Sequence, residues 1–244
     1  MTVMLLHGVP ETPDLWDPLR AALGRDDVVA PRLPGFGSPL PDGFDATMGT
    51  YAAWLATELA AHDDVHLVGH DWGGLLAMRV LADRPANVRS WVLDGGDLAD
   101  DFRWHDTALT FQTPGEGEAL VEAIVDNTLA ERTAILAGLG VPEAHAEAMA
   151  APMDRTMGEA ILALYRSATA IGTEWGPGID RFTGPGLIVE SGQDPFRSPG
   201  RARRLAERTG ATVAELPDAG HWWMLEDPEG VAARLEAFWA GAAS

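Results

Sequence analysis

The stretch Val65-His66-Leu67-Val68-Gly69-His70-Asp71-Trp72-Gly73-Gly74 decides the fold of this chain. Its short apolar run ends in a sharp turn, and residues 75–78 indicate that a helix begins at once. Gly69 and Gly73 flank Asp71, and glycines let the backbone pass closely on either side of a strained tip residue. A strand, a tight turn and a helix in this order predict a nucleophile elbow with Asp71 at its tip.

The carboxylate at the tip selects the chemistry, because most such elbows carry a serine. A serine hydroxyl suits acyl transfer, since the resulting ester can be hydrolysed. A carboxylate that attacks a saturated carbon instead forms an alkyl ester, which activated water can cleave. Asp71 therefore indicates substrates with a leaving group on sp³ carbon, chiefly epoxides and alkyl halides. The alternative is an aspartate that only caps the following helix.

Strand-like and helix-like segments alternate on both sides of this elbow. The expected strands are residues 2–6, 28–30, 65–69, 91–93, 186–190 and 212–216. The expected helices are residues 15–23, 48–59, 72–84, 201–208 and a last one from Pro228. Strands separated by helices predict a mostly parallel, doubly wound α/β sheet.

The pattern changes between Leu98 and Asp180. This segment is helix-like, rich in Ala, Glu and Met, and has no strand pattern. Helix breakers stand at Pro114-Gly115, Gly140 and Pro142. We therefore expect a core made of residues 1–97 and 181–244, with residues 98–180 inserted as a helical cap.

Composition narrows the class of protein. A chain of 244 residues with 46% hydrophobic and 22% charged residues fits one large globular domain. A formal charge of −20 argues against nucleic acids and anionic membranes as partners, and against strongly anionic substrates unless a local basic pocket binds them. With no cysteine, disulfides and thiolate metal sites are excluded. The start shows no signal-peptide pattern, so we expect a cytoplasmic protein.

With these motifs in order, the chain resembles the α/β-hydrolase family, in particular its Asp-nucleophile branch of epoxide hydrolases and haloalkane dehalogenases. The resemblance rests on five motifs: His7-Gly8-Val9-Pro10, Gly35-Phe36-Gly37, Gly69-His70-Asp71-Trp72-Gly73-Gly74, Gly192-Gln193-Asp194 and Gly220-His221. It implies an α/β-hydrolase fold with a cap. Because the chain starts at the strand before the oxyanion loop, we expect an N-terminally shortened sheet of six strands. Its exposed edge would need cover from a helix or from another subunit of a homo-oligomer.

The resemblance also implies a role for each motif. Asp71 would be the nucleophile, and His221 would activate the hydrolytic water. Asp194 would orient His221, with Asp97 as the rival acid, because some relatives place the carboxylate after the preceding strand. The backbone N–H groups of Val9 and Trp72 would form the oxyanion hole.

The remaining two histidines near the elbow point to support and not to ligation. His7 and His70 are expected to be buried, hydrogen-bonded side chains, and His70 directly before Asp71 is not metal-ligand spacing. We expect neither a metal nor a cofactor.

The leaving group is decided in the cap. Opening an epoxide needs a donor to the departing oxygen, and by resemblance cap tyrosines, usually two, supply it. The chain has two tyrosines, and Tyr51 precedes the elbow, so Tyr165 is the expected donor. Trp104 and His105 are candidates for a second donor and for the substrate pocket.

A dehalogenase would instead need N–H donors around the halide. By resemblance these are the Trp after the nucleophile and a second Trp or Asn. Trp72 is present, but Val9 stands where one dehalogenase group has Asn. Trp104 and Trp175 in the cap could substitute, and both are expected pocket residues.

We therefore favour an enzyme that hydrolyses a small apolar or weakly polar epoxide to a vicinal diol through an ester on Asp71. Haloalkane dehalogenation is the alternative. A hydrolase fold that only binds a small ligand is disfavoured, because a binding protein needs no base such as His221.

Overall fold

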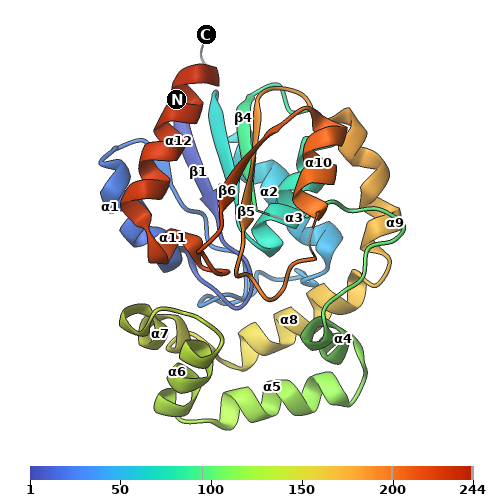
Figure 1. Cartoon of the computed structure of the whole chain (residues 1–244). Helices are drawn as coiled ribbons and strands as arrows, with labels where there is room; N and C mark the ends of the chain where they lie inside the picture. The colour runs from blue at the N-terminus through green and yellow to red at the C-terminus, as the bar shows by residue number, and fades with distance from the viewer. Residues whose placement is uncertain (95, 199, 243–244) are drawn as a thin grey trace.

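A sheet of parallel strands runs through the centre of the computed structural model, which describes residues 1–94, 96–198 and 200–242 (Figure 1). Within these residues the sheet has six strands in the order β2-β1-β3-β4-β5-β6. The strands are β1 (Thr2–Leu6), β2 (Val28–Val29), β3 (Val65–Gly69), β4 (Val88–Leu93), β5 (Gly186–Ser191) and β6 (Thr212–Leu216). The parallel α/β sheet expected from the sequence is confirmed.

Strand register decides which side chains meet at the end of the sheet. Leu6 pairs with Gly69, and Gly69 pairs with Leu93. The next residue of each strand, namely His7, His70 and Asp94, therefore lies at the same carboxyl edge. Ligand and active sites of open α/β sheets form at this edge.

Helices cover both faces of the sheet because its strands are apolar on both sides. Leu5 and Val68 belong to one buried cluster, whereas Leu6 and Leu67 belong to the other. The covering helices are α1 (Asp17–Leu23), α2 (Met48–Ala60), α3 (Trp72–Leu81), α9 (Ile171–Trp175), α10 (Arg201–Thr209), α11 (Trp223–Glu226), α12 (Pro228–Ala242) and the 3₁₀ turns η1 (Pro13–Trp16) and η2 (Gly176–Arg181). Helices α1 and α12 pack on each other at one face, and α2 and α3 pack on each other at the opposite face (Figure 1).

Five further helices lie across the carboxyl end of the sheet (Figure 1). They are α4 (Asp106–Gln112), α5 (Glu116–Asp126), α6 (Leu129–Gly138), α7 (Glu143–Ala150) and α8 (Arg155–Ser167). Helix α8 approaches α5 so closely at Gly158 that an added Cβ would lie 2.3 Å from Cγ1 of Val121. The rest of the segment expected to form the cap, α9 and η2, returns to the core, where η2 contacts α3 and α10.

Two element boundaries differ from the expected ones. The helix after the elbow ends at Leu81 and not near Arg84, because Arg84 takes a left-handed φ of 57° before Pro85. Strand β4 begins at Val88, three residues earlier than expected, since Val88 still pairs with Val65 beyond an irregularity in the ladder. Edge strand β2 is only two residues long, which leaves few unpaired backbone groups at that edge.

Among the described residues, no helix combines the length and the apolar character that crossing a bilayer requires.

Candidate active site

Asp71 stands at the tip of a strained elbow between β3 and α3. Its backbone has φ 50° and ψ −122°, a conformation that non-glycine residues rarely adopt. The neighbouring chain must come very close: a Cβ on Gly73 would lie 2.4 Å from the carbonyl oxygen of Leu6. Asp71 is also the N-cap of α3, so its carboxylate lies at the positive end of the helix dipole.

The loop after β1 holds the carboxylate from the other side. The backbone N–H of Val9 donates to Oδ1 of Asp71 at 2.9 Å. A side chain on Gly8 would place its Cβ 2.3 Å from the same oxygen, so only glycine fits. The predicted partner of Val9, Trp72, is the first residue of α3, where backbone N–H groups are free of helical bonds. The N–H of Val9 thus already bonds an oxygen of the Asp71 side chain, and the oxyanion hole formed with the N–H of Trp72 stays a prediction.

His221 and Asp194 meet at the same edge of the sheet. His221 follows β6, Asp194 follows β5, and Nδ1 of His221 donates to Oδ2 of Asp194 at 2.8 Å. This bond leaves Nε2 of His221 without a hydrogen bond to the described residues, and His221 and Asp71 line the same cavity. Burial alone would raise the pKa of Asp194, but the hydrogen bond and charge of His221 outweigh it and lower that pKa to about 2.

Asp97, the rival acid, is engaged elsewhere. Its carboxylate is fully buried and forms ion pairs with Arg204 and Arg208 of α10, the second at 2.6 Å. These two arginines neutralise Asp97 and tie the loop after β4 to α10. The structure therefore brings Asp194, and not Asp97, to His221.

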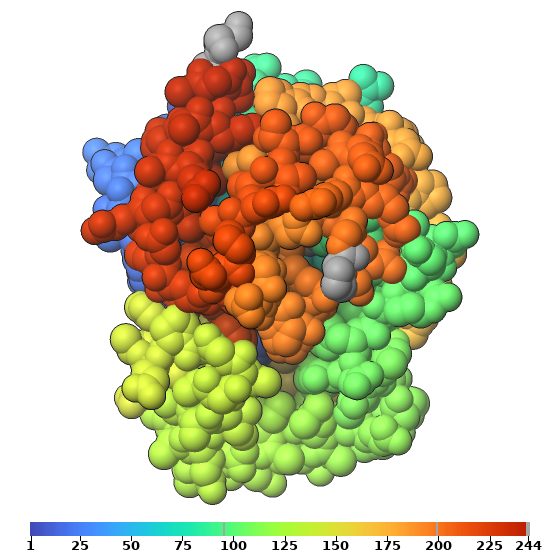
Figure 2. Space-filling view, viewed as in Figure 1, coloured from blue at the N-terminus to red at the C-terminus, as the bar shows by residue number. Residues whose placement is uncertain are grey.

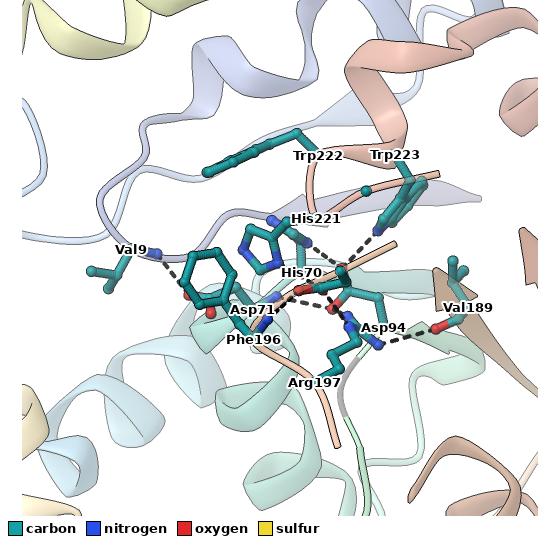
Figure 3. A network of polar contacts seen from close by, with 12 residues as sticks. Val9, His70, Asp71, Asp94, Val189, Phe196, Arg197, His221, Trp222 and Trp223 are labelled. Atoms are coloured by element: carbon teal, nitrogen blue, oxygen red, sulfur yellow. Dashed lines mark hydrogen bonds and ion pairs between the residues drawn. The ribbon is translucent and has the colours of Figure 1, made fainter. Parts of the chain in front are cut away.

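A buried network around His70 lies directly behind the elbow (Figure 3). Nδ1 of His70 donates to Asp94, and Nε2 donates to Oε1 of Glu11 at 3.0 Å. Burial opposes a charge on His70, but the two carboxylates outweigh it and raise its pKa well above the usual value. His70 is therefore an imidazolium ion held between two carboxylates. The indole N–H groups of Trp222 and Trp223 complete the network by donating to Glu11 and Asp94, respectively.

Arg197 joins this network to the His221–Asp194 pair (Figure 3). Its Nε donates to Asp194 at 2.6 Å, and its Nη2 lies 3.0 Å from Oδ1 of Asp94. The same Asp94 oxygen accepts from the backbone N–H of Asp71 at 3.0 Å. Arg197 thus connects Asp194, the partner of His221, to Asp94, which accepts from the backbone of the elbow.

The support role expected for His7 and His70 agrees with these contacts, but the sequence reasoning missed Glu11, Asp94 and Arg197. His7 is neutral, because burial lowers its pKa to about 4. The available signal for Asp94 was its position one residue beyond a strand, at the carboxyl edge of the sheet. Glu11 and Arg197 carry no comparable mark in the sequence.

Tyr165 enters the site from α8. Its side chain is buried and lines the cavity together with Asp71 and His221. The ring meets those of Trp72 and Trp104 edge-on, with centroids 5.3 Å and 5.2 Å away. Burial and the charge of Asp71 raise the pKa of Tyr165 well above its usual value. The phenol therefore keeps its proton and can act as a donor.

His105, at the N-terminus of α4, also lines this cavity. Its Nδ1 accepts from the backbone N–H of Ala108 at 3.3 Å, and burial lowers its pKa. A neutral ring that accepts at Nδ1 carries its proton on Nε2. His105 therefore offers a second N–H donor in the wall of the cavity.

The two tryptophans expected in the pocket are placed differently. Trp104 stacks on Trp72 at 5.5 Å, but its indole N–H is already bonded to the carbonyl of Ala168 at 2.9 Å. Trp175 lies in α9 within the hydrophobic core and lines neither cavity that reaches Asp71. Trp175 therefore lies outside these two cavities, because α9 packs back against the core and not over the site.

Two cavities meet at Asp71, His105 and His221. The first has a volume of about 150 Å³, lies mostly beneath α5, α6 and α8, and is lined mainly by apolar side chains. The second, of about 90 Å³, approaches from the side of Arg197 and Arg201. The surface is hollowed where the cap meets the segment after β5 (Figure 2). An apolar molecule can therefore reach the carboxylate of Asp71.

One group of side chains resembles a metal-ligand set. Glu11, His70 and His221 each bring a ligand atom within 4.8 Å of the others. Both nitrogens of His70, however, already donate to carboxylates. While these bonds persist, His70 has no lone pair for a metal ion, so we interpret the group as part of the hydrogen-bond network.

This geometry defines the class of protein: an α/β fold with a carboxylate at a nucleophile elbow, a histidine paired to an acid, and a cap above them. Residues 3–234 match the model of the alpha/beta hydrolase family, so the chain belongs to that family. In fold, the crystal structure of haloalkane dehalogenase DbeA from Bradyrhizobium elkani is similar, with a TM-score of 0.80 at 25% identity over 99% of this chain and 90% of that one.

Among curated relatives, a haloalkane dehalogenase of Mesorhizobium japonicum is 33% identical over 144 residues, which are 54% of this chain and 45% of the relative. A soluble epoxide hydrolase of Corynebacterium sp. (strain C12) is 39% identical over 97 residues, which are 38% of this chain and 34% of the relative. The chain thus spans less than half the length of these curated relatives. The resemblance to the Asp-nucleophile branch is confirmed at the level of the family and its fold.

Proposed function

We propose that the chain hydrolyses epoxides to vicinal diols through a covalent alkyl ester on Asp71. The observation that carries this proposal is the placement of Tyr165, whose phenol lines the same cavity as Asp71 and His221. An epoxide oxygen leaves only if it is protonated or hydrogen-bonded, and a buried phenol of raised pKa keeps the proton that this step needs.

In the first step an oxygen of Asp71 attacks an epoxide carbon. The new C–O bond forms as the C–O bond of the ring breaks, and the departing oxygen takes a proton from Tyr165. His105 supports the same oxygen through its Nε2 proton. The N–H of Val9 holds the Asp71 carboxylate in position for the attack.

In the second step water cleaves the ester. His221 accepts a proton from water through Nε2, and Asp194 stabilises the resulting imidazolium. The hydroxide attacks the carbonyl carbon of the Asp71 ester, and the charge that develops on its oxygen faces the N–H groups of Val9 and Trp72. The ester C–O bond then breaks, and the diol oxygen that came from Asp71 takes the proton from His221. The proton left on the regenerated Asp71 carboxyl group returns to Tyr165, so the diol leaves an enzyme in its starting state.

Haloalkane dehalogenation is the second candidate, and one observation favours it. The indole Nε1 of Trp72, next to the nucleophile, is buried beside the hydroxyl of Tyr165 and has no other hydrogen-bond partner among the described residues. Such a donor suits a halide ion. The similarity to dehalogenases in sequence and fold supports the same activity. Against it, Trp72 does not line either cavity, because the rings of Tyr165 and Trp104 cover it.

The first prediction separates these activities. With a panel of styrene oxide, a terminal alkyl epoxide and 1-bromobutane, the wild type should form diol from the epoxides and release little bromide from the halide. In the variant Tyr165→Phe, the rate at which epoxides alkylate Asp71 should fall about 10²–10⁴-fold, the usual contribution of a general acid. Bromide release that exceeds epoxide turnover would favour the dehalogenase. No turnover of any substrate would favour a protein that only binds.

Tyr51 provides the matched control. It is the other tyrosine of the chain and donates to the carbonyl of Pro34 at 2.6 Å, away from the cavity. Tyr51→Phe removes a hydroxyl of the same kind and should keep the epoxide turnover. If Tyr165→Phe also keeps it, Tyr165 only packs against Trp72.

The second prediction concerns the order of the steps. Asp71 needs no base for its attack, whereas water does. His221→Gln should therefore accumulate an alkyl adduct on Asp71, visible as a mass increase of the intact protein. The control His145→Gln, in cap helix α7, should turn over without an adduct.

Oxygen labelling completes this test. In a single turnover of the wild type in ¹⁸O-water, the label should appear in the peptide that contains Asp71 and not in the diol. A labelled first diol with an unlabelled peptide would mean that Asp71 acts as a general base on water, and it would refute the covalent ester.

A further inference from the structure

The first cavity contains a cation that the proposed chemistry does not use. Arg132 of α6 lines it, and among the described lining residues it is the single Lys or Arg. Another arginine of the cap, Arg166, is paired with Glu118 at 2.7 Å. Among the described residues, no carboxylate forms such an ion pair with Arg132.

The contacts of Arg132 leave one edge of its guanidinium unused. Its Nη1 donates to the carbonyl oxygens of Val125 and Asn127, at 3.4 Å and 3.2 Å, and thereby caps the C-terminus of α5. Its Nε is buried and has no hydrogen-bond partner within the described chain. Nη2 likewise has no hydrogen bond within the described chain, but unlike Nε it is not fully buried, so it is the N–H group of Arg132 that a ligand can reach. A charged N–H group without a partner forms a strong hydrogen bond with an anionic ligand.

Helix α6 shows where Arg132 lies relative to the opening. Arg132, Ile135, Leu136 and Leu139 follow one another at helical spacing and all line the cavity. Ile135 and Leu139 are 46% and 47% exposed, so they stand at its mouth. Arg132 lies one helical turn before Ile135, at the end of this stripe next to α5.

The wall between Arg132 and Asp71 is apolar. It includes Val121, Ile124, Met157 and Ile161. The other acid in the lining, Asp154, is exposed and caps α8 by accepting from the N–H of Met157 at 2.8 Å. A molecule that fills the cavity would therefore offer a hydrocarbon body to this wall.

We propose that the guanidinium group of Arg132, through Nη2, binds a carboxylate at the end of an apolar substrate whose reactive carbon lies at Asp71. This subsite deepens the proposed function by naming the substrate class: an electrophile on a hydrocarbon body that ends in a carboxylate. The overall charge of −20 repels anions at long range. The carboxylate is bound in spite of this charge, because the pair forms in an apolar cavity where screening by water is weak.

The test uses ligands without a reactive group, so that it does not depend on the covalent chemistry. Calorimetry compares straight-chain carboxylates of six to twelve carbons with primary alcohols of equal length. The wild type should bind the best carboxylate roughly 10- to 100-fold more tightly than its alcohol, as for hydrogen bonds to a charged group. Equal affinities in the wild type would overturn the proposal without any variant.

Variants then test whether Arg132 causes the preference for carboxylates over alcohols. Arg132→Gln should abolish it while leaving the affinity for the alcohol unchanged, and Arg132→Lys should retain only part of it, because lysine keeps the charge but not the planar guanidinium group. Arg155→Gln, at an exposed cap arginine outside the cavity, is the matched control and should keep the preference. A preference that survives Arg132→Gln would overturn the subsite.

The two proposals fail separately. If neutral epoxides are hydrolysed and carboxylates show no preference, the subsite is wrong and the reaction stands. If carboxylates are preferred and neither neutral nor carboxylated epoxides are hydrolysed, the subsite stands and the reaction is wrong.

Discussion

Asp71 combines two features that are unfavourable for folding. Its φ of 50° lies in a region that costs a non-glycine residue about 1–3 kcal/mol. In addition, removal from water raises the pKa of its carboxyl group above the usual value. A carboxyl group with a raised pKa binds its proton more tightly in the folded than in the unfolded state. The stability of the wild type therefore falls as pH rises from the ordinary carboxyl pKa through the raised one.

The next prediction follows at this residue. Asp71→Asn keeps an acceptor for the N–H of Val9 but removes the charge, so it should abolish turnover and raise Tm. For a domain of this size a rise of about 2–4 °C corresponds to about 1 kcal/mol. The gain should be larger at pH 7 than near pH 3. An unchanged Tm at pH 7 would contradict the unfavourable environment of this carboxylate.

The pKa of Asp194 is shifted in the opposite direction to that of Asp71, so Asp194 serves as the control. Its pKa is lowered to about 2, so its contribution to stability is present above the ordinary carboxyl pKa and is lost as pH falls through about 2. Asp194→Asn should therefore lower Tm at pH 7. Its difference from the wild type should shrink toward pH 2.

At the scale of elements, the segment between β5 and α10 connects the parts of the site. It carries both Asp194 and Arg197, and Arg197 also reaches Asp94 at the end of β4. Its Nη1 donates to the carbonyl of Val189 in β5 at 3.2 Å, which fixes the side chain against its own strand. One arginine thus holds together the acid, the elbow and two neighbouring strands.

This arrangement predicts a strong dependence on Arg197. Arg197→Met leaves the buried carboxylates of Asp94 and Asp194 without their shared cation, and breaking such a pair costs about 3–5 kcal/mol. Arg197→Lys keeps the charge and should lose less. The measurement is urea unfolding of both variants. Arg204→Met would not serve as a control, because Arg204 pairs with buried Asp97. Arg20→Met, at an exposed pair with Asp17, is the suitable control and should change stability little. Equal stability of Arg197→Met and the wild type would contradict this role.

At the scale of the whole molecule, the sequence predicted best those candidate site residues that lie just beyond the ends of strands. Asp71, Asp194 and His221 each follow an expected strand with a glycine one or two residues before them, so local patterns were enough to place them at one edge. The partners Glu11 and Arg197 were not predictable in this way. They reach the site only because separate loops close on one another, and such contacts leave no periodicity in the sequence.

The cap shows the same division. Its helical character and the single tyrosine in it were evident, and Tyr165 does line the cavity. The different positions of Trp104 and Trp175 were not evident, because they depend on how α9 turns back to the core. The role of Arg132 was not evident for the same reason. The sequence does not show that this arginine lines the cavity without a carboxylate partner.

The tryptophans around the nucleophile give the site an optical probe of its own. Trp222 lines the cavity beside Asp71, while Trp72 and Trp104 lie stacked behind Tyr165. In the proposed mechanism, ester formation on Asp71 removes a negative charge from among these indoles, and an electric field of that size shifts indole emission. The steps of a single turnover are therefore open to stopped-flow fluorescence with unlabelled substrates. In His221→Gln the emission should change once and then hold, because the ester persists.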